Sequence, residues 1–556
     1  MAAELSPLIL SLLERRGFTG DAAAAFLAPD YESHTHPAEL LADCDAATAR
    51  TLAAMDRGER VAIYADFDCD GIPGAALLFE LFAKLAYQNV EVYIPHRDRE
   101  GYGFHRDAID ALASRGVTLI ITVDVGTTAV DAIAYAKEKG IDVIVTDHHE
   151  ILSALPAAVA VLNPKREPYP FPHLCGTGVA FKFAQALLRR GRAEGREPFV
   201  GIPTGWEKWL LDLVAIATVA DMVPLVGENR ALVHWGLMVL RKTSRPGIAA
   251  LCLKIRLRRD QITEEDIGFS IAPRINAASR MDEPMLAWKL LTTRDQSEAQ
   301  TLAAMLESLN ASRKGVVGGI VKEAKKRVSV RDQKSDRVIV LGDPEWKPSL
   351  LGLAANSIVG EHGGIVCLWG RDALGRLKGS CRSDGSISVV KLFESARDSF
   401  EEYGGHAASG GFTLADGAVH ALPQRLAEAA LALEASASPE SAAFDALVSL
   451  REISMSLWRD LSRLSPYGLG NPKPVFRIDQ VQIGSLKRFG KEKNHVEVML
   501  SCPDTGARVR AYDFFRAPDG FSQPLEEGAM SSVIGTIERD AFRGGVSLRL
   551  VDVLAG

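Results

Sequence analysis

Short apolar runs alternate with amphipathic segments along the first third of the chain. The runs have strand length and strand-favouring residues, while the segments between them repeat their apolar positions with helical spacing. The predicted strands cover residues 60–66, 90–95, 118–124 and 142–147, and the predicted helices cover 71–86, 105–116 and 128–140. Strands that are apolar throughout and separated by helices indicate a parallel sheet covered on both faces.

The pattern becomes helical after residue 164 and ends in a long polar-faced helix predicted from Gln296 to Val328. A second, smaller α/β unit follows. Its predicted strands cover 336–342, 364–370 and 376–383, and its predicted helix covers 350–361. A small, polar, proline-containing stretch at 434–442 is the clearest linker, and the short alternating strands beyond it indicate a small β-barrel.

Composition and charge narrow the class of protein. With 556 residues the chain is too long for one core, and 47% hydrophobic and 24% charged residues are ordinary values for a soluble globular protein. No apolar run approaches the ~18 residues of a membrane span, and the N-terminal apolar stretch is interpreted as a surface helix rather than a signal peptide. Seven scattered cysteines favour a reducing, cytoplasmic compartment. The net charge of −7 excludes a uniformly basic DNA-binding chain but not a local basic groove.

Acidic residues and histidines collect where the predicted strands end. Four motifs carry them: ADFDCDG with Asp66, Asp68 and Asp70, VDVG with Asp124, VTDHHE with Asp147, His148 and His149, and VADMVP with Asp221. The last motif follows an apolar run and precedes a proline. Because the carboxyl ends of parallel strands lie along one edge of a sheet, where ligands bind, we expect these groups to converge.

Converging carboxylates predict bound cations. A buried, unpaired charge costs several kcal/mol, and divalent cations are the simplest compensation. Oxygen ligands suit Mg²⁺ and Mn²⁺, an added imidazole favours Mn²⁺, and the number of acids predicts two ions with one bridging carboxylate, an arrangement that serves phosphoester hydrolysis. Taken singly, each aspartate is better explained as a helix cap or turn residue, and for Asp221 the two interpretations are evenly matched. The joint occurrence favours the metal site.

In this order the four motifs resemble the metal motifs of the DHH phosphoesterases. Five further segments resemble the RecJ single-strand exonucleases, so that the resemblance covers essentially the whole chain: CGTGVAFKFAQAL, APRINAASRM, GSCRSDG, YGGHAASGGF and SPYGLGNPKPVF. The resemblance implies an α/β fold, with a parallel-sheet DHH domain and a smaller α/β DHHA1 domain joined by a long helix, followed by a C-terminal OB-fold-like β-barrel. The implied parts are an N-terminal arm at 1–45, the DHH catalytic domain at 46–295, the connecting helix at 296–335, the DHHA1 domain at 336–434 and the OB-fold-like domain at 443–556.

The resemblance also implies which residues form the site. The family's metal ligands fall on Asp68, Asp70, Asp124, His148 and Asp221, while Asp66 either binds metal or orients its neighbours. Besides Asp70 and Asp124, the implied catalytic residue is His149, which would face the scissile phosphate as an electrostatic group or a proton donor. The implied substrate-binding residues are Arg274, Asn276, Arg280, Arg382, Ser383, Gly404, Gly405 and His406. Arginine grips phosphate bidentately and paired glycines let backbone amides approach an anion, although a Gly-Gly pair can also be a tight turn and residues 274–280 a surface loop.

In the β-domain, a basic cluster surrounds one aromatic residue. It comprises Lys487, Arg488, Phe489, Lys491 and Lys493. Grooves for single strands combine cations for the backbone with aromatic rings for base stacking, so we expect this cluster to bind DNA. A solvated hairpin loop is an equally good explanation for any one of these residues.

The function implied by the resemblance is single-stranded-DNA-specific 5′-to-3′ exonuclease activity. Such enzymes release mononucleotides with two Mn²⁺ or Mg²⁺ ions in DNA repair and recombination, and a single-strand binding protein and a helicase are implied partners. One alternative is a DHH-family phosphodiesterase acting on short oligonucleotides or cyclic dinucleotides. Another is a non-catalytic single-strand binding protein, which the intact ligand set disfavours. Physical reasoning on the residues leaves open the polarity, the preferred metal, the choice of DNA over RNA and the oligomeric state.

Overall fold

The computed structural model describes residues 6–152, 154–330, 337–434, 444–490, 493–540 and 543–556. Contacts divide the chain into two compact units. The first combines Met1–Pro29 with Ser436–Tyr467 and Asn471–Gly556, and the second holds Asp30–Ala435 with Gly468–Gly470. The predicted arm at 1–45 is thus divided between the units, and the predicted linker at 434–442 lies, except for Glu434, outside the described residues.

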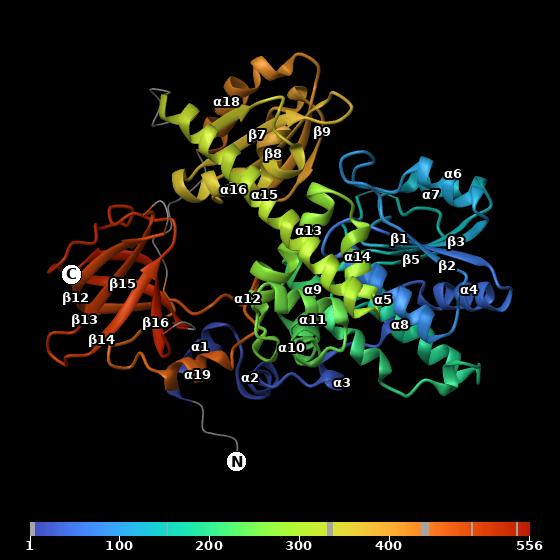
Figure 1. Ribbon diagram of the computed structural model, residues 1–556, viewed down its shortest axis with the longest axis horizontal. Coiled ribbons are helices and arrows are strands. Elements are labelled where there is room, and N and C mark those ends of the chain that lie inside the picture. The colour runs from blue at the N-terminus through green and yellow to red at the C-terminus, as the bar shows by residue number, and fades with distance from the viewer. Residues whose placement is uncertain (1–5, 153, 331–336, 435–443, 491–492, 541–542) are drawn as a thin grey trace. The chain divides into compact units, whose positions relative to one another are not determined.

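The second unit begins with the predicted parallel sheet, which is confirmed (Figure 1). Its strands stand in the order β2-β1-β3-β4-β5, and all neighbours are parallel. The strands are β1 Arg60–Ala65, β2 Val90–Tyr93, β3 Val117–Val123, β4 Asp142–Thr146 and β5 Ala160–Leu162. The helices between them are α5 Gly71–Lys84, α6 Arg106–Ser114 and α7 Val130–Glu138, and α8 Gly176–Ala193 follows β5.

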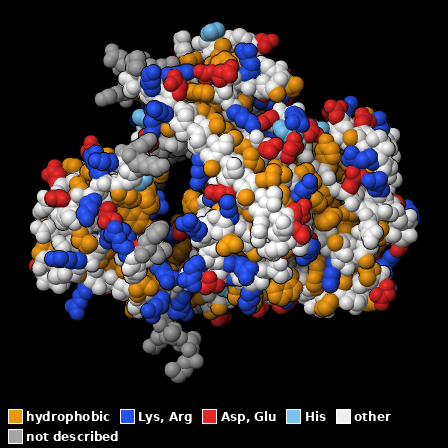
Figure 2. All heavy atoms as spheres, viewed as in Figure 1, with side chains coloured by type: hydrophobic (Ala, Val, Ile, Leu, Met, Phe, Trp, Pro, Cys, Tyr) orange, Lys and Arg blue, Asp and Glu red, His pale blue; other side chains and the backbone are white. Residues whose placement is uncertain are grey.

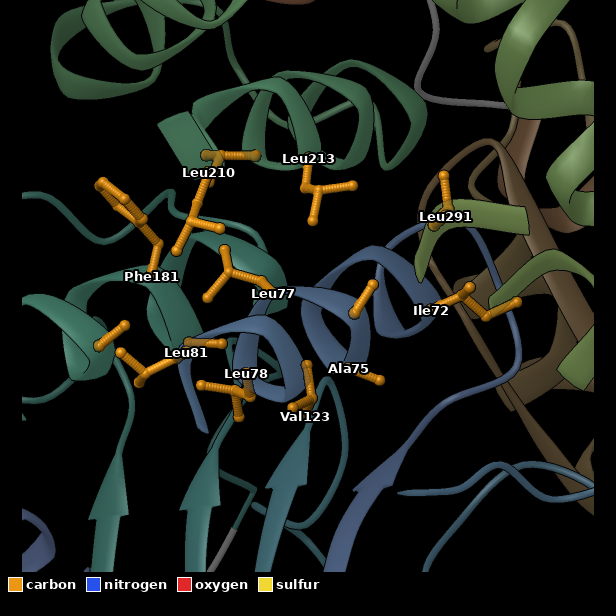
Figure 3. Close-up of a cluster of buried hydrophobic side chains, with 14 of the residues drawn as sticks. Ile72, Ala75, Leu77, Leu78, Leu81, Val123, Phe181, Leu210, Leu213 and Leu291 are labelled. Atoms are coloured by element: carbon orange, nitrogen blue, oxygen red, sulfur yellow. The ribbon is translucent and has the colours of Figure 1, made fainter. Parts of the chain in front are cut away.

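Alternating residues of β1 enter two separate cores, one on each face of the sheet. Val61 and Ile63 pack among residues of α5 and α8, whereas Ala62 and Tyr64 pack among residues of α6 and α7. Figure 3 shows α5 side chains, including Leu77 and Leu81, lying between the sheet and the helices above it. Burial on both faces explains why the strands are apolar throughout and fixes their carboxyl ends along one edge.

A helical layer completes the first half of the second unit. Its main helices are α9 Leu211–Ala220, α10 Gly227–Lys242, α11 Pro246–Lys254, α13 Ala272–Met281 and α14 Met285–Thr292. The predicted long helix is α15, Gln296–Val330. Its first half packs into the core that contains α5, and its second half packs Ile320 and Ala324 against the smaller α/β part. One helix therefore belongs to both parts.

The smaller α/β part is a mixed sheet in the order β6-β7-β8-β10-β9. Only β6 and β7 are parallel neighbours, and the other pairs are antiparallel. The strands are β6 Val338–Gly342, β7 Ile365–Arg371, β8 Leu377–Ser383, β9 Phe400–Gly405 and β10 Ser409–Leu414. Helix α16, Pro348–His362, packs with α15 on one face, and α17 Val389–Ser395 and α18 Leu422–Glu434 pack on the other.

Three glycines interrupt α15 without a packing reason. A Cβ added at Gly315, Gly318 or Gly319 would meet no atom within 4 Å. Because glycine costs about 0.5–1 kcal/mol relative to alanine inside a helix, each Gly→Ala change should stabilise the protein by about that amount. The free energy of unfolding in urea measures the gain. Gly236→Ala in α10 is the contrasting variant and should destabilise the protein, because its Cβ would lie 2.4 Å from the Leu211 carbonyl oxygen.

The first unit contains the predicted β-barrel. Strands stand in the order β11-β12-β13-β14-β16-β15, and β12 also pairs with β15 and closes the barrel. They are β11 Ala446–Leu447, β12 Phe476–Phe489, β13 His495–Ser501, β14 Arg508–Asp513, β15 Met530–Arg539 and β16 Val546–Ala555. The predicted OB-like fold class is confirmed, and β12 runs on through the basic cluster as far as Phe489.

The N-terminal helices belong to the barrel unit. In α1, Pro7–Arg15, the residues Ile9, Leu12 and Leu13 are almost fully buried in the barrel's core, and α2, Gly20–Leu27, adds Phe26. The N-terminal apolar stretch is therefore an amphipathic helix with one face in a core, not a helix that merely lies on the surface. Among the described residues, no helix is both long enough and apolar enough to cross a membrane.

Candidate metal centre

The first acidic motif is a tight loop between β1 and α5. It begins where the Asp66 amide donates to the Val123 carbonyl oxygen (3.1 Å). Within the loop, Asp68 Oδ1 accepts the amides of Asp70 (2.8 Å) and Gly71 (3.2 Å). A Cβ at Gly71 would lie 2.3 Å from the Asp66 carbonyl oxygen, so only glycine permits this turn. The loop therefore gathers three carboxylates at the edge of the sheet.

The remaining motifs reach the same place from different elements. Asp124 follows β3 with a φ of +60°, an uncommon conformation for a residue with a side chain, and such strain concentrates at functional sites. His148 and His149 follow β4. Asp221, however, is the C-cap of helix α9 and not the end of a strand. The expectation that strand ends would gather the acids therefore holds for the first three motifs, while helix packing delivers the fourth.

The ligand atoms of the predicted residues lie close enough together to bind a common metal ion. His148 Nε2 is 3.1 Å from Asp124 Oδ1, 3.6 Å from Asp221 Oδ2 and 3.7 Å from Asp70 Oδ2. Three groups have ligand atoms all within 4.8 Å: Asp66, Asp68 and Asp124; Asp70, His148 and Asp221; and Asp124, His148 and His149. Asp124 and His148 each belong to two groups, which is the arrangement expected of two neighbouring ions that share a carboxylate.

Helix α8 anchors one side of this cluster. Asp70 accepts the amides of Gly176 (2.6 Å) and Thr177 (2.8 Å) at the first turn of α8. The positive end of a helix stabilises a carboxylate there. A Cβ at Gly176 would lie 2.5 Å from that of Asp124 and 2.9 Å from its Oδ1. The start of α8 thus sets the position of two candidate ligands at once.

The chemistry of the cluster fits divalent cations. Oδ1 of Asp66, Oδ1 of Asp124 and Oδ2 of Asp221 are buried and accept no hydrogen bond. Burial, reinforced by the neighbouring carboxylates, raises the pKa of all three groups well above the ordinary value. Buried carboxylate oxygens that accept no hydrogen bond cost free energy. Bound cations would compensate their charge. The residues present therefore suit Mn²⁺ or Mg²⁺.

The two histidines differ in environment. Burial lowers the pKa of His148 despite the opposing charge of Asp70, which keeps the imidazole neutral as a metal ligand requires. His149 Nδ1 lies 2.7 Å from Asp147 Oδ1. Burial alone would lower the pKa of His149, but this hydrogen bond and the charge of Asp147 raise it. Asp147, 1% exposed, also accepts the Thr127 amide (2.8 Å), so it fixes the His149 ring.

A group of arginines lies beside the carboxylates. Burial and the nearby charge of Arg97 lower the pKa of Arg280 to about 9, with Arg382 among the other contributors. Arg97 stacks on the Phe67 ring, 4.7 Å from its centroid. Within the part of the chain that the structure describes, these three arginines form no ion pair. Guanidinium groups without carboxylate partners are available for charge-assisted hydrogen bonds to an anion.

The structure gives three predicted substrate-binding residues partners within the protein. Arg274 pairs with Glu307 (2.7 Å) and donates to the Ser270 carbonyl oxygen (2.7 Å). Asn276 Oδ1 accepts the Cys69 amide (3.0 Å). Ser383 Oγ donates to the Ile387 carbonyl oxygen (2.7 Å). Arg280 donates from Nη1 to the Ser349 carbonyl oxygen (2.5 Å), but among the described residues its buried Nε has no hydrogen-bond partner; Arg382 donates from Nη1 to the Cys381 carbonyl oxygen (2.8 Å).

Gly404 and Gly405 are the exposed last residues of β9, and His406 begins the exposed connection to β10. Gly405 has a φ of +146°, and a Cβ there would lie 2.3 Å from the Ser409 carbonyl oxygen. Gly404 lines a cavity of about 650 Å³ together with Phe67, Arg97 and Tyr102. The hydrogen bond from Lys165 lowers the pKa of Glu150, the residue after His149, and His406 contributes to a smaller extent. The end of β9 thus borders a cavity that Arg97 and Tyr102 also line.

The predicted barrel residues are Lys487, Arg488 and Phe489 at the end of β12. Phe489 lies 5.1 Å from the His495 ring and 5.9 Å from the Phe514 ring. Phe515, 66% exposed, continues this aromatic cluster. Lys491 lies outside the described residues. Figure 2 shows Lys and Arg side chains interspersed with Asp and Glu side chains on the visible face.

Sequence reasoning missed Arg97, Tyr102 and Gly176 as site residues, and it placed Asp147 in the cluster without giving it a role. Tyr102 Oη lies 3.3 Å from His149 Nδ1 and 3.4 Å from Nε2, so it sits over the ring rather than in its plane. A signal for two of them existed, because residues 95–103 follow a parallel strand and contain two glycines. Gly176 had no such signal, since its importance comes from packing against Asp124.

Comparisons with known proteins identify the family. The model "DHH family, N-terminal domain" matches residues 60–218, and the model "RecJ OB domain" matches residues 444–551. The single-stranded-DNA-specific exonuclease RecJ of Bacillus subtilis is 35% identical over 89% of this chain, and this chain spans 62% of its length. The enzyme of the same name from Escherichia coli is 32% identical over 86% of this chain and 84% of its own.

A solved structure agrees with these relatives. The crystal structure of RecJ in complex with Mn²⁺ from Thermus thermophilus superposes with a TM-score of 0.81, at 29% identity over 99% of this chain and 76% of that one. RecJ from the same organism has also been solved with Mg²⁺. The fold, the acidic cluster and relatives that are alike over most of both chains lead to one conclusion: the chain belongs to the RecJ family.

Proposed function

We propose that this chain is an exonuclease specific for single-stranded DNA that acts from the 5′ end and releases mononucleotides, in DNA repair and recombination. The observation that carries the proposal is the buried cluster of carboxylates and His148, with unpaired oxygens, directly beside a group of arginines. A non-catalytic binding protein would have no use for such a cluster. The choice of single-stranded DNA rests on the similarity to the single-stranded-DNA-specific exonucleases of Bacillus subtilis and Escherichia coli.

We assign the metal ligands as two sets that meet at Asp124. Asp66, Asp68 and Asp124 would hold one ion, and Asp70, Asp124, His148 and Asp221 the other. Bound there, Mn²⁺ or Mg²⁺ ions supply an activated water and neutralise charge on the phosphoryl oxygens. Asp147 holds Nδ1 of His149, which leaves Nε2 as the atom that can deliver a proton. As water attacks phosphorus and the P–O3′ bond breaks, His149 Nε2 protonates the departing O3′.

End-labelled DNA tests the proposed function directly. A 5′-labelled single strand should yield labelled mononucleotide from the first time point, whereas a 3′-labelled strand should shorten gradually. Blunt duplex should resist, and EDTA should stop the reaction until Mn²⁺ or Mg²⁺ is restored. Binding without hydrolysis under either metal would instead indicate a single-strand binding protein. Hydrolysis confined to short oligonucleotides or cyclic dinucleotides would indicate the other DHH-family activity.

Replacing Arg382 with alanine should mainly weaken binding of the DNA. Its guanidinium group lies in space that Gly352 leaves open, and its Nη1 donates to the adjacent Cys381 carbonyl oxygen (2.8 Å). Loss of one charge-assisted phosphate contact costs about 1.5–3 kcal/mol, so the KM for a single strand should rise about tenfold or more with kcat little changed. Arg397→Ala in the same domain is the matched control, since Arg397 stacks on Tyr403 instead.

The barrel should hold the strand without taking part in hydrolysis. All assigned metal ligands precede residue 434, while Lys487, Arg488 and Phe489 lie in the other unit. Changing Lys487 and Arg488 to alanine should lower the affinity for long single strands and flatten its salt dependence by about 0.7 in the log–log slope per lost phosphate contact. Cleavage of very short oligonucleotides should be unchanged. An unaltered salt slope for long strands would argue that this surface serves a protein partner.

We also infer a cytoplasmic location and two kinds of partner. Every cysteine in the chain is free, and six are buried, which suits a reducing compartment. A helicase would supply single strands from duplex, and a single-strand binding protein would present them. Measuring degradation of duplex with and without an added helicase tests the first of these partners. Co-sedimentation with a single-strand binding protein tests the second.

A further inference from the structure

Asn276 contacts the loop between β1 and α5 that carries Asp66, Asp68 and Asp70. We call this loop, residues 66–70, the metal loop. Asn276 Oδ1 accepts the backbone amide of Cys69 at 3.0 Å, across 207 positions of sequence. Cys69 is 1% exposed and stands between Asp68 and Asp70. Because only the oxygen of a carboxamide can accept from an N–H, the donor settles which way the side chain is turned. The sequence-based expectation that Asn276 binds substrate therefore does not account for this hydrogen bond.

Few groups from outside the loop hold its backbone. Asp66 donates to Val123 at the start, and Thr177 Oγ1 donates to the Asp70 carbonyl oxygen (2.5 Å) at the end. Between these points, the remaining restraint from another element among the described residues is Asn276 on the Cys69 amide. The loop carries three carboxylates that repel one another, so its middle needs an external support.

Helix α13, which carries Asn276, is itself secured to the smaller α/β part. Arg280 Nη1 donates to the Ser349 carbonyl oxygen (2.5 Å), and Ser349 Oγ donates back to the Arg280 carbonyl oxygen (3.3 Å). Residues four apart lie on the same face of a helix. Asn276 and Arg280 thus connect one face of α13 to the metal loop at one end and to α16 at the other.

We propose that Asn276 is a positioning residue for the metal ligands. Its carbonyl oxygen holds the Cys69 amide so that Asp68 and Asp70 face the ions, and it does this before any DNA is bound. Partners that orient ligands without touching the metal commonly change metal affinity tenfold or more when removed. The inference rests on the proposed two-ion site but not on the nature of the substrate.

Mn²⁺ titration of the full-length protein without DNA is the decisive experiment. Asn276→Leu removes the acceptor at similar size, and its Mn²⁺ affinity, measured by calorimetry, should fall roughly tenfold. Asn276→Asp restores an acceptor and should bind Mn²⁺ at least as tightly as the unchanged protein. At saturating Mn²⁺, the KM for a single strand should be the same in Asn276→Leu and the unchanged protein. Ser279→Ala is the matched control, because the hydroxyl of this buried α13 residue donates to a carbonyl oxygen of its own helix, that of Asn276 (3.3 Å).

Two results would overturn the proposal. One is unchanged Mn²⁺ affinity in Asn276→Leu together with a raised KM for DNA, which would make Asn276 a substrate contact. The other is an equal loss of affinity in Asn276→Leu and Asn276→Asp, which would mean general damage to the fold. Asn276→Ala replaces Asn276→Leu if the larger side chain prevents folding, as judged by circular dichroism. Because Mn²⁺ binding is measured without DNA, failure of the nuclease assay would count against the proposed function alone.

Discussion

Asp124→Asn should abolish metal-dependent hydrolysis of single-stranded DNA while making the metal-free protein more stable. Asp124 is 4% exposed and belongs to two of the three ligand groups, so both ions lose an anionic ligand when the side chain becomes neutral. The rate on labelled single strands should fall by about 10²–10³-fold or more. Asparagine has nearly the same shape and removes a buried charge that repels Asp70 and Asp68, and a gain of ~1 kcal/mol would raise Tm by about 2–4 °C.

The pH dependence of the melting temperature gives an independent test of this charge repulsion. The pKa of Asp66, Asp124 and Asp221 is raised in the folded protein, so these groups stabilise the fold below their unfolded pKa and lose that contribution as the pH rises through the folded value. Metal-free protein should therefore gain stability on acidification from neutral pH. The gain should be smaller in Asp124→Asn, and saturating Mn²⁺ should reduce it in the unchanged protein. Identical pH profiles for both proteins would contradict repulsion at Asp124.

Gly176→Ala should inactivate the enzyme without removing any functional group. The new methyl would lie 2.5 Å from the Asp124 Cβ and 2.7 Å from its Cα, so the ligand or the start of α8 must shift. Asp70 would move as well, because it accepts the Gly176 amide. Misplacement of catalytic groups by about 1 Å can cost roughly 10²-fold in rate. Single-turnover hydrolysis and Mn²⁺ affinity should both fall.

Gly178→Ala is the matched control in the same helix. Its Cβ would lie 3.5 Å from its nearest neighbour, the Leu174 Cβ, which is an ordinary van der Waals contact. This variant should keep both activity and Mn²⁺ affinity, and its stability should equal or exceed that of the unchanged protein. If both alanine variants lose activity equally, the effect belongs to helix α8 as a whole and not to the contact with Asp124.

Local patterns predicted the parts of the fold that depend on neighbours in sequence. The strands of the first sheet are apolar because both faces are buried, so periodicity alone located β1, β3 and β4 and placed their polar ends at one edge. The long helix α15 and the strands of the barrel were likewise visible as uninterrupted or alternating patterns. Local patterns also predicted ligand chemistry, because carboxylates and imidazole select cations wherever the fold gathers them.

Contacts between distant segments were not predictable in this way. Asp221 reaches the cluster from a helix end, and Asn276 reaches the metal loop rather than a surface. Arg274 is paired within the protein although its motif suggested substrate binding. Each outcome depends on how helices pack, and the residues concerned look no different in sequence from exposed polar residues.

The sequence by itself determined the sheet, the barrel and a cluster of metal-binding groups, because apolar periodicity and the types of ligand are properties of short segments. Only the tertiary structure decided which oxygens remain unpaired, which arginines lie beside them and which side chains merely hold the ligands in place. It also joined the N-terminal helices to the barrel's core. The physical reason is that burial and hydrogen-bond pairing arise when segments far apart in sequence exclude water together, and no local pattern records that event.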